Sequence, residues 1–458
     1  MLYHIVWFEF LEGVTAFQIS DLRDAVLALK EKIPCVVDIA FGGKSSSIAS
    51  RTTHTHCLTV IFKKASDLPT YDAHPAHQHV VKNFVLPIKK TVNAIDFEDG
   101  RDEFTLGNAS HGVFFDFTGA SVSQLKICEE GILGMLVKIP CIIDLAFGKN
   151  ITSRTPHTHG LIVSFASTSD EAVYDAHEAH KSVVETCILP ILKSVNVLDF
   201  DKEKSTSYEL VIGQKNYSSW SLRPWILMKT MGLNFVEKEV DVSGKGYNTE
   251  LLKYSPSGLV PCLITSSSRS SSSSSSTTTT SLAVWEGLSI IELLHERHPL
   301  RNVWPIDADA RARARSVSSE MACGFQALRS EMPCNIKLKL EGYPKPYPDA
   351  LAKNISRIET LVADAREEFG LLAEGRFAGP FLFGAFCAAD AMYTPVATRF
   401  RTYNVQHTNP VVTAYFEALL NHPSFREWET SAFLEEGLGR ALQHYDETSV
   451  LKGGKRRE

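Results

Sequence analysis

Hydrophobic positions in the first two hundred residues follow two kinds of spacing, which alternate in a regular order. Apolar residues at helical spacing predict a helix that begins at Ser20 and ends before Pro34. A second helical segment is predicted over 71–90. Apolar runs of strand length open the chain and recur at 36–41, 57–62 and 92–97. The predicted order is strand, helix, strand, strand, helix, strand, which is typical of a ferredoxin-like α+β domain.

This pattern occurs twice, and the second copy lies about 105 residues after the first. The repeated motifs are Ile33-Pro34-Cys35 with Ile139-Pro140-Cys141, His54-Thr55-His56 with His157-Thr158-His159, and Tyr71-Asp72-Ala73-His74 with Tyr174-Asp175-Ala176-His177. A period of this length is too long for a solenoid repeat. We therefore expect two copies of one small domain, over 1–105 and 106–204.

The run Tyr71-x-x-His74-Pro75-x-His77 resembles the hallmark of the stress-responsive dimeric α/β-barrel family. The resemblance implies that two such domains pack sheet to sheet, so a tandem copy would form its own pseudo-dimer. A plant polyketide cyclase of that family uses the matching tyrosine and last histidine as acid and base. By that resemblance Tyr71 with His77, and Tyr174 with His180, form a candidate barrel site. The alternative is that these histidines only line or seal the barrel.

After a polar stretch at 201–207, which suggests a domain boundary near 205, the pattern changes. An alternating run at 208–213 predicts a strand, and the residues from Leu222 onward have the spacing of an amphipathic helix. The Ser/Thr tract at 265–281 cannot bury apolar area, so we expect a disordered insertion in a hairpin there. The rest is predicted to be helical, with helices over 307–329 and 348–369 and another that begins near Asp390.

Serines lie at the junction between that strand and helix, at Ser218, Ser219 and Ser221. A helix N-terminus carries free N–H groups and a partial positive charge, so it can bind an anion or stabilise a thiolate. The alternative interpretation is that the serines only cap the helix, because serine is common at that position.

Together with Val260-Pro261 and Glu286, this junction resembles the glutathione-binding half of the cytosolic glutathione transferases, most closely the serine-dependent zeta-type and bacterial members. The resemblance implies a thioredoxin-like domain over 206–303 and an all-helical domain over 304–448, with glutathione as co-substrate. It also implies a cis peptide bond before Pro261, backbone pairing of glutathione at Val260, and a bond from the γ-glutamyl end of glutathione to Glu286.

Within that resemblance, Ser218 and Ser219 are the candidate hydroxyl donors to the glutathione thiol. Ser218 matches the acting position, and Ser219 and Ser221 are then expected mainly to satisfy the free N–H groups of the helix. Arg223, in the first turn, either assists electrostatically or is a surface residue. Gly287 departs from the family, in which a hydroxyl residue usually follows the acidic one; its backbone N–H remains available. Guesses for the wall of the second-substrate pocket are Ala327, Met332, Tyr343 and Tyr393.

Composition narrows the function further. The net charge is −6, so nothing in it predicts nucleic-acid or membrane binding. The nine cysteines contain no C-x-x-C pair, and no leader or membrane-spanning run is predicted, which favours the cytoplasm. No metal is expected, because the histidine clusters have no completing carboxylate or cysteine. The expected partners are glutathione and a small electrophile, and a homodimer through the transferase-like portion is compatible with the pattern.

The sequence thus predicts an α+β and α/β multidomain chain: tandem ferredoxin-like barrel repeats, a thioredoxin-like domain and a helical domain. Three functional classes remain open. The first is a glutathione transferase with an appended barrel module. The second is a barrel cyclase or ligand-binding protein with an accessory transferase-like domain. The third is a stress protein in which neither site is active.

Overall fold

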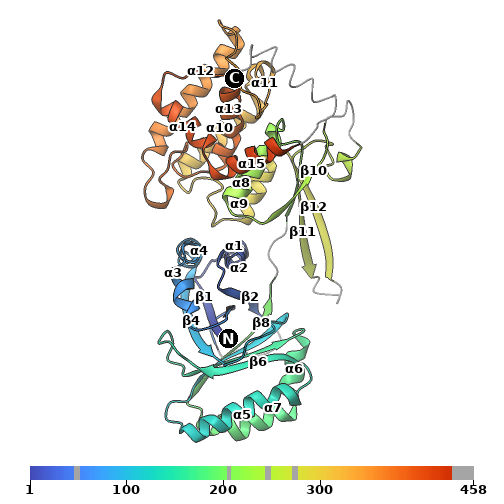
Figure 1. Ribbon diagram of the computed structural model, residues 1–458, viewed down its shortest axis with the longest axis vertical. Coiled ribbons are helices and arrows are strands. Elements are labelled where there is room, and N and C mark those ends of the chain that lie inside the picture. The colour runs from blue at the N-terminus through green and yellow to red at the C-terminus, as the bar shows by residue number, and fades with distance from the viewer. Residues whose placement is uncertain (46–51, 204–207, 243–248, 271–276, 436–458) are drawn as a thin grey trace. The chain divides into compact units, whose positions relative to one another are not determined.

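A computed structural model describes residues 1–45, 52–203, 208–242, 249–270 and 277–435 (Figure 1). The chain divides into two compact units, Met1–Ser205 and Thr206–Glu458. The division lies where the polar stretch suggested a boundary.

The first unit contains two copies of the predicted element order. Copy 1 has β1 (Leu2–Phe10), α1 (Ala16–Leu27), α2 (Leu29–Lys32), β2 (Val36–Lys44), β3 (His56–Phe62), α3 (Asp67–Ala73), α4 (Pro75–Val80) and β4 (Lys89–Glu98). Copy 2 has β5 (Ala109–Asp116), α5 (Val122–Lys138), β6 (Ile142–Lys149), β7 (His159–Phe165), α6 (Ser169–Ala176), α7 (Glu178–Val183) and β8 (Ser194–Lys202). The ferredoxin-like order is confirmed. The predicted helix start at Ser20 is wrong: α1 begins four residues earlier, because Thr15 and Gln18 form a capping box that precedes the apolar spacing.

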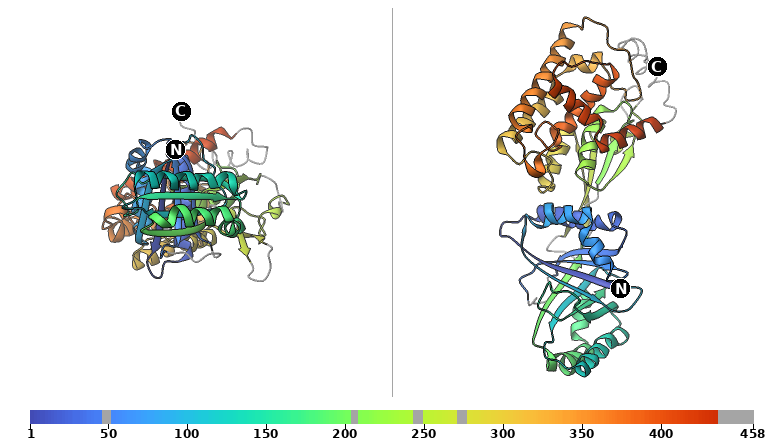
Figure 2. Two further views of the ribbon diagram at one scale, coloured as in Figure 1. Left: turned by 90° about the horizontal axis from the view of Figure 1, so that it is seen from below. Right: turned by 60° about the vertical axis from the view of Figure 1, so that its left-hand side comes forward.

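All eight strands form one sheet in the order β4-β1-β3-β2-β8-β5-β7-β6. The two copies join where Gly42 of β2 pairs with Lys202 of β8, and an isolated bridge between Phe97 and Asn150 joins them again at the other edge. The helices of the two copies lie on opposite sides of the unit, with the strands between them (Figures 1 and 2). Two joined edges are what the predicted pseudo-dimeric barrel requires.

Equivalent glycines stand at both seams. A Cβ on Gly42 would lie 1.7 Å from the backbone oxygen of Asp201, and one on Gly148 would lie 2.4 Å from that of Glu98. Inside the barrel, Trp7 stacks on its counterpart Phe114 with ring centroids 3.8 Å apart. The interior is therefore a packed core that both copies share.

The second unit begins with a four-stranded sheet in the order β10-β9-β11-β12. Its elements are β9 (Tyr208–Ile212), α8 (Ser219–Thr230), β10 (Phe235–Glu239), β11 (Cys262–Ser270), β12 (Thr277–Trp285) and α9 (Gly287–Arg297). Strands β9 and β10 are parallel, whereas β11 is antiparallel to both of its neighbours. This βαβ unit followed by a hairpin and a helix confirms the thioredoxin-like fold.

The prediction that 265–281 is a disordered insertion is wrong for most of its length. The pairs continue from Thr265–Leu282 to Ser270–Thr277, so the tract extends both strands of the hairpin as far as the described residues reach. The physical reason is that β-branched threonine favours extended backbone and the ladder supplies the hydrogen bonds. Residues 271–276 lie outside the described part.

Helices make up the remainder: α10 (Ala308–Cys323), α11 (Gln326–Glu331), α12 (Asp349–Ala365), α13 (Ala388–Thr402), α14 (Pro410–Leu420) and α15 (Pro423–Leu434). One helix was predicted over 307–329, but two are present, because Gly324 is extended and ends the first, and the left-handed Phe325, with φ +57°, precedes the second. Their apolar faces share one core with α8 and α9, so the sheet and the helices form a single packed body.

Candidate functional site

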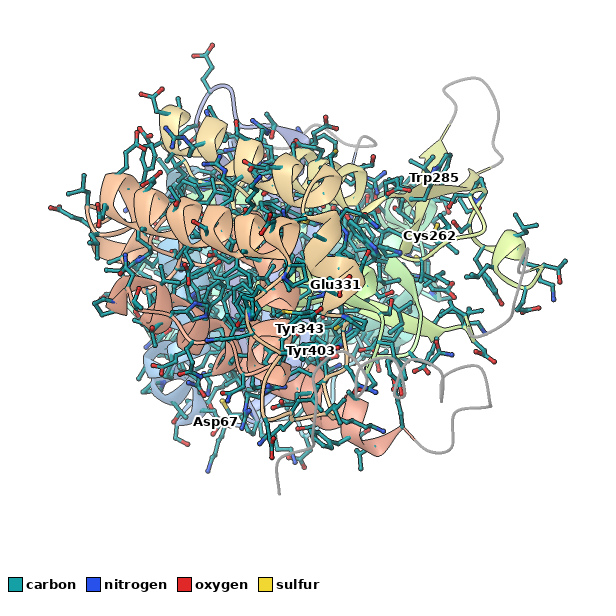
Figure 3. All side chains as sticks on the ribbon, turned by 90° about the horizontal axis from the view of Figure 1, so that it is seen from above. Asp67, Cys262, Trp285, Glu331, Tyr343 and Tyr403 are labelled. Carbon is teal, nitrogen blue, oxygen red and sulfur yellow. The ribbon has the colours of Figure 1, made fainter. Side chains whose placement is uncertain are left out.

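The strand register brings the predicted glutathione-site residues to one edge of the sheet. Cys262, the first residue of β11, pairs with Val211 on one side and with Trp285 on the other (Figure 3). Neighbouring strands lie about 4.8 Å apart. The turn after β9, which leads to Ser218, therefore lies at the same edge as Pro261 and Glu286.

The peptide bond between Val260 and Pro261 is cis, as the resemblance implied. Val260 precedes β11 and is partly buried. Within the described residues, its backbone N–H and C=O make no backbone hydrogen bond. A buried or half-buried peptide group needs a partner, and an extended peptide ligand can supply one.

Glu286 is the residue before α9 and has a φ of +68°, which is rare for a residue that is not glycine. Its side chain is exposed and makes no capping bond to the helix. Such strained positions are concentrated at functional sites, because the surrounding structure must enforce them. Gly287 follows as the first helical residue, and a Cβ built on it meets no atom within 4 Å.

Ser218 occupies the N-cap position of α8 but does not cap it: its side chain makes no bond to the helix N–H groups. Instead its hydroxyl donates to Oγ of Ser221 at 2.7 Å, and Ser221 Oγ also accepts the backbone N–H of Gly213 at 3.1 Å. Ser219 Oγ accepts from the guanidinium of Arg399 at 3.2 Å. The expectation that Ser219 and Ser221 satisfy helix N–H groups is therefore wrong. The bond between Ser218 and Ser221 is the contact that sequence reasoning missed, and the spacing of three residues was the available signal.

Arg223 is not a surface residue, because only 1% of it is exposed. Its guanidinium donates to the backbone oxygens of Ser219 at 2.8 Å and Met392 at 3.3 Å. Burial, followed by the charges of Arg399 and Arg329, lowers the pKa of Arg223 to about 9. A cation is thus fixed below the first turn of α8, on the side away from solvent.

The four residues suggested for the wall of the second-substrate pocket differ in burial and in hydrogen bonding. Met332 and Tyr393 are fully buried core residues, and the Tyr393 hydroxyl donates to the backbone oxygen of Val317. Tyr343 donates to Glu331 at 2.6 Å (Figure 3). Ala327 is partly buried on α11.

In the first unit, both predicted tyrosine–histidine pairs come together. The rings of Tyr71 and His77 have centroids 4.2 Å apart, and so do those of Tyr174 and His180. His77 Nδ1 lies 3.2 Å from the backbone oxygen of Asp72, and His180 Nδ1 lies 3.4 Å from the backbone oxygen of Asp175. Donation to these carbonyls leaves Nε2 of each ring as the basic nitrogen.

The two pairs differ in their surroundings. The Tyr71 hydroxyl is buried and has no hydrogen-bond partner within the described residues, and burial raises its pKa. Beside it, His4 bonds Asp96 at 2.6 Å, and Asp96 accepts from Thr152 of the other copy at 2.7 Å. In copy 2, burial lowers the pKa of His111, but the bond to Asp199 and the charges of Asp199, Asp175 and Glu171 together leave that pKa raised.

Among the described residues, no group of three or more histidine, cysteine, aspartate or glutamate side chains is placed to hold a metal ion. In the same part of the chain, every helix is too short or too polar to cross a lipid bilayer.

Family models match three segments of the chain. The stress responsive A/B barrel domain matches residues 2–99 and 109–202, and the glutathione S-transferase N-terminal domain matches residues 217–297. A stress-response A/B barrel domain-containing protein from Arabidopsis thaliana is 29% identical over 150 residues. That match takes in 30% of this chain and 54% of the plant protein, so the chain spans about half the length of that relative.

Solved structures of glutathione transferases resemble the other half of the chain. A glutathione transferase homolog from Burkholderia, solved with bound glutathione, is 19% identical and covers 50% of this chain and 99% of its own, with a TM-score of 0.34. A glutathione transferase from Populus trichocarpa is 15% identical and covers 50% of this chain and 100% of its own, with a TM-score of 0.36. With the matched segments and the fold, the conclusion is that the chain carries two stress-responsive A/B barrel domains followed by a glutathione S-transferase N-terminal domain and a helical region.

Proposed function

We propose that residues from 206 onward form a glutathione-dependent transferase that conjugates a small electrophile. The observation that carries the proposal is the Ser218 hydroxyl, which stands at the start of α8 without capping it. The side-chain oxygen of a capping serine would accept hydrogen bonds from the helix N–H groups. Here the Ser218 hydroxyl is not bonded to the helix N–H groups, so it can turn to one anionic sulfur atom beside the positive end of the helix.

Ser221 and Gly213 complete a chain of donors toward that sulfur. A hydroxyl hydrogen rotates freely to suit its partners. When a thiolate is bound, the Ser221 hydroxyl donates to Ser218 Oγ, and the Ser218 hydroxyl turns to the sulfur. The Gly213 N–H continues to donate to Ser221 Oγ. Donors linked in this way strengthen one another.

The other predicted contacts hold the tripeptide. The free backbone edge at Val260, before the cis Pro261, pairs with the backbone of glutathione. Glu286 binds the ammonium group of the γ-glutamyl residue of glutathione. The backbone N–H of Gly287, at the start of α9, donates to the carboxylate of the same residue. Fixing the thiol in this way lowers its pKa by roughly one to three units, which raises the thiolate fraction at neutral pH.

The chemical step is a displacement by the thiolate. A carbon–sulfur bond forms at the electrophilic carbon, the leaving group departs with its electron pair, and the thiol proton has already passed to solvent. The test is calorimetric titration of the full chain with glutathione, followed by an assay with 1-chloro-2,4-dinitrobenzene. Saturable binding together with chloride release above the uncatalysed rate supports the proposal, and absence of binding contradicts it.

A second candidate function belongs to the first unit, and it is favoured by the buried Tyr71 hydroxyl beside His77. There Nε2 of His77 would remove a proton from an aromatic polyketide, while Tyr71 donates to its carbonyl oxygen. Turnover of such a substrate that is lost in Tyr71→Phe, with binding retained, would support this assignment.

A further inference from the structure

Three arginines from distant parts of the chain converge below the first turn of α8. Arg223 lies on α8, Arg329 on α11 and Arg399 on α13. Arg399 donates to the backbone oxygens of Met332 and Pro395 and to Ser219 Oγ. Arg329 donates to the backbone oxygen of Met321 at 3.1 Å. Their acceptors are all neutral.

In the part of the chain that the structure describes, the cluster has no carboxylate partner. Within the described residues, no carboxylate lies at ion-pair distance from any of the three guanidinium groups, although several exposed arginines of the same unit have such partners. Arg223 and Arg399 are 1% and 4% exposed. Burial lowers the pKa of all three, and the charge of Arg399 lowers those of Arg223 and Arg329 further. Buried charges are ordinarily paired, so this cluster is incomplete without an anion.

One side of the cluster is accessible. Arg329 and Trp220 are both only partly buried. The guanidinium carbon of Arg223 lies 4.2 Å from the Trp220 ring centroid, and that of Arg329 lies 5.7 Å from it. The left-handed Phe325 begins the short helix that presents Arg329. An anion that also has a planar apolar part would find both a ring to stack on and a cation to pair with.

Arg223 donates to the backbone oxygen of Ser219 and Arg399 donates to Ser219 Oγ, so the cluster contacts the residue next to Ser218, where the thiolate would form. We propose that Arg329 and Trp220, backed by the charges of Arg223 and Arg399, select a second substrate that bears a carboxylate on an aromatic or similarly flat group. This inference rests on the proposed function, because it names the substrate class of the same site.

The test uses two electrophiles that differ in charge and hardly in shape, 4-chloro-3-nitrobenzoate and 4-chloro-3-nitrobenzamide. In both, the thiolate of glutathione forms a bond to the ring carbon that carries chlorine, and chloride leaves with the bonding electrons. Each enzymatic rate is divided by its uncatalysed rate. We expect kcat/KM, corrected in this way, to be at least tenfold higher for the benzoate. Equal values for the two would overturn the proposal.

Variants test whether the arginine cluster causes the preference for the benzoate. Arg329→Gln should reduce the benzoate-to-benzamide ratio at least tenfold through KM, and Arg329→Lys should restore at least a third of it, because the charge returns. The control is Arg357→Gln, which removes an exposed arginine that pairs with Glu320 at 2.8 Å. It should keep the wild-type ratio. A purely structural role of Arg329 would instead lower Tm and leave the ratio unchanged, and that result would overturn the proposal.

A direct binding measurement distinguishes failure of this inference from failure of the proposed function. The unreactive pair 4-nitrobenzoate and 4-nitrobenzamide is titrated into the full chain without glutathione, with Trp fluorescence as the readout. If wild type binds the benzoate tenfold more tightly and Arg329→Gln loses this difference, the anion site is supported. That result stands even if no conjugation is found, and then only the proposed function fails. Equal binding of the two probes refutes the anion site whatever the conjugation assay shows.

Discussion

The Ser218 hydroxyl lies 2.7 Å from Ser221 Oγ, one helical turn further along the chain. Ser221 is fully buried and also accepts the N–H of Gly213, so it is fixed in position and in turn orients Ser218. The pair links the end of β9 to the first turn of α8. Under the proposed function, Ser221 would act on the thiol through Ser218, as a positioning residue.

The first prediction follows from this pair. Ser221→Ala should lower conjugation at pH 7 by about three- to tenfold, because one linked hydrogen bond of about 1 kcal/mol is lost. It should also raise the apparent pKa in a pH–rate profile. Ser219→Ala is the matched control: its hydroxyl bonds Arg399 and not Ser218, so it should reduce stability and leave the pH profile in place. If both variants leave the profile unchanged, Ser221 has only a structural role.

The second prediction concerns the missing hydroxyl after Glu286. Because a Cβ on Gly287 meets nothing within 4 Å, Gly287→Ser should fit and add a donor for the γ-glutamyl carboxylate. We expect about fivefold tighter glutathione binding, which corresponds to about 1 kcal/mol. Gly287→Ala adds the same Cβ without the hydroxyl and should bind within twofold of wild type. Calorimetric titration measures the glutathione affinity of both variants. Equal affinities would mean that Glu286 and Gly287 do not contact glutathione.

The third prediction tests the seam of the barrel. Gly42→Ala places a Cβ against the backbone oxygen of Asp201, so strand β2 must move away from β8. We expect the free energy of unfolding of the first unit to fall by about 1–3 kcal/mol. Gly134→Ala, in α5, meets no atom within 4 Å and should raise it by about 0.5–1 kcal/mol. Equal effects in denaturant titrations would mean that the seam does not stabilise the unit.

The fourth prediction concerns pH. Burial raises the pKa of the Asp390 carboxyl to about 6, even though it accepts the N–H groups of Leu382 and Cys387. The folded state therefore holds this proton more tightly than the unfolded chain does, and stability falls as the pH rises from about 4 to about 6. The loss relative to Asp390→Asn should reach about 3 kcal/mol. Denaturant titrations of both proteins from pH 4 to 7 measure it, and a constant difference would contradict the buried, protonated carboxyl.

Much of the fold could be predicted from the sequence, because each copy in the first unit repeats one pattern and strand register follows from alternation. Capping chemistry that lies ahead of the apolar spacing, as at Thr15, was missed. So was the extension of the hairpin into the Ser/Thr tract, where composition indicated disorder but threonine favours strands.

The candidate site was only partly predictable. Ser218, Pro261 and Glu286 were expected from the resemblance to glutathione transferases, and the strand register places the segments that carry them at one edge of a sheet. The bond between Ser219 and Arg399 joins residues 180 positions apart, and spacing along the chain carries no information on such tertiary contacts. For this reason, the arginine cluster could be recognised only in the folded structure.

We infer that Ser218 stabilises the glutathione thiolate, and the decisive measurement is a pH–rate profile of Ser218→Ala. The profile is measured with 1-chloro-2,4-dinitrobenzene at saturating glutathione, beside wild type and Ser219→Ala. Ser218→Ala should raise the apparent pKa by at least about one, with a large loss of kcat at pH 7 that is largely recovered at alkaline pH. A profile of Ser218→Ala that coincides with wild type, or a shift seen in Ser219→Ala alone, would contradict the claim.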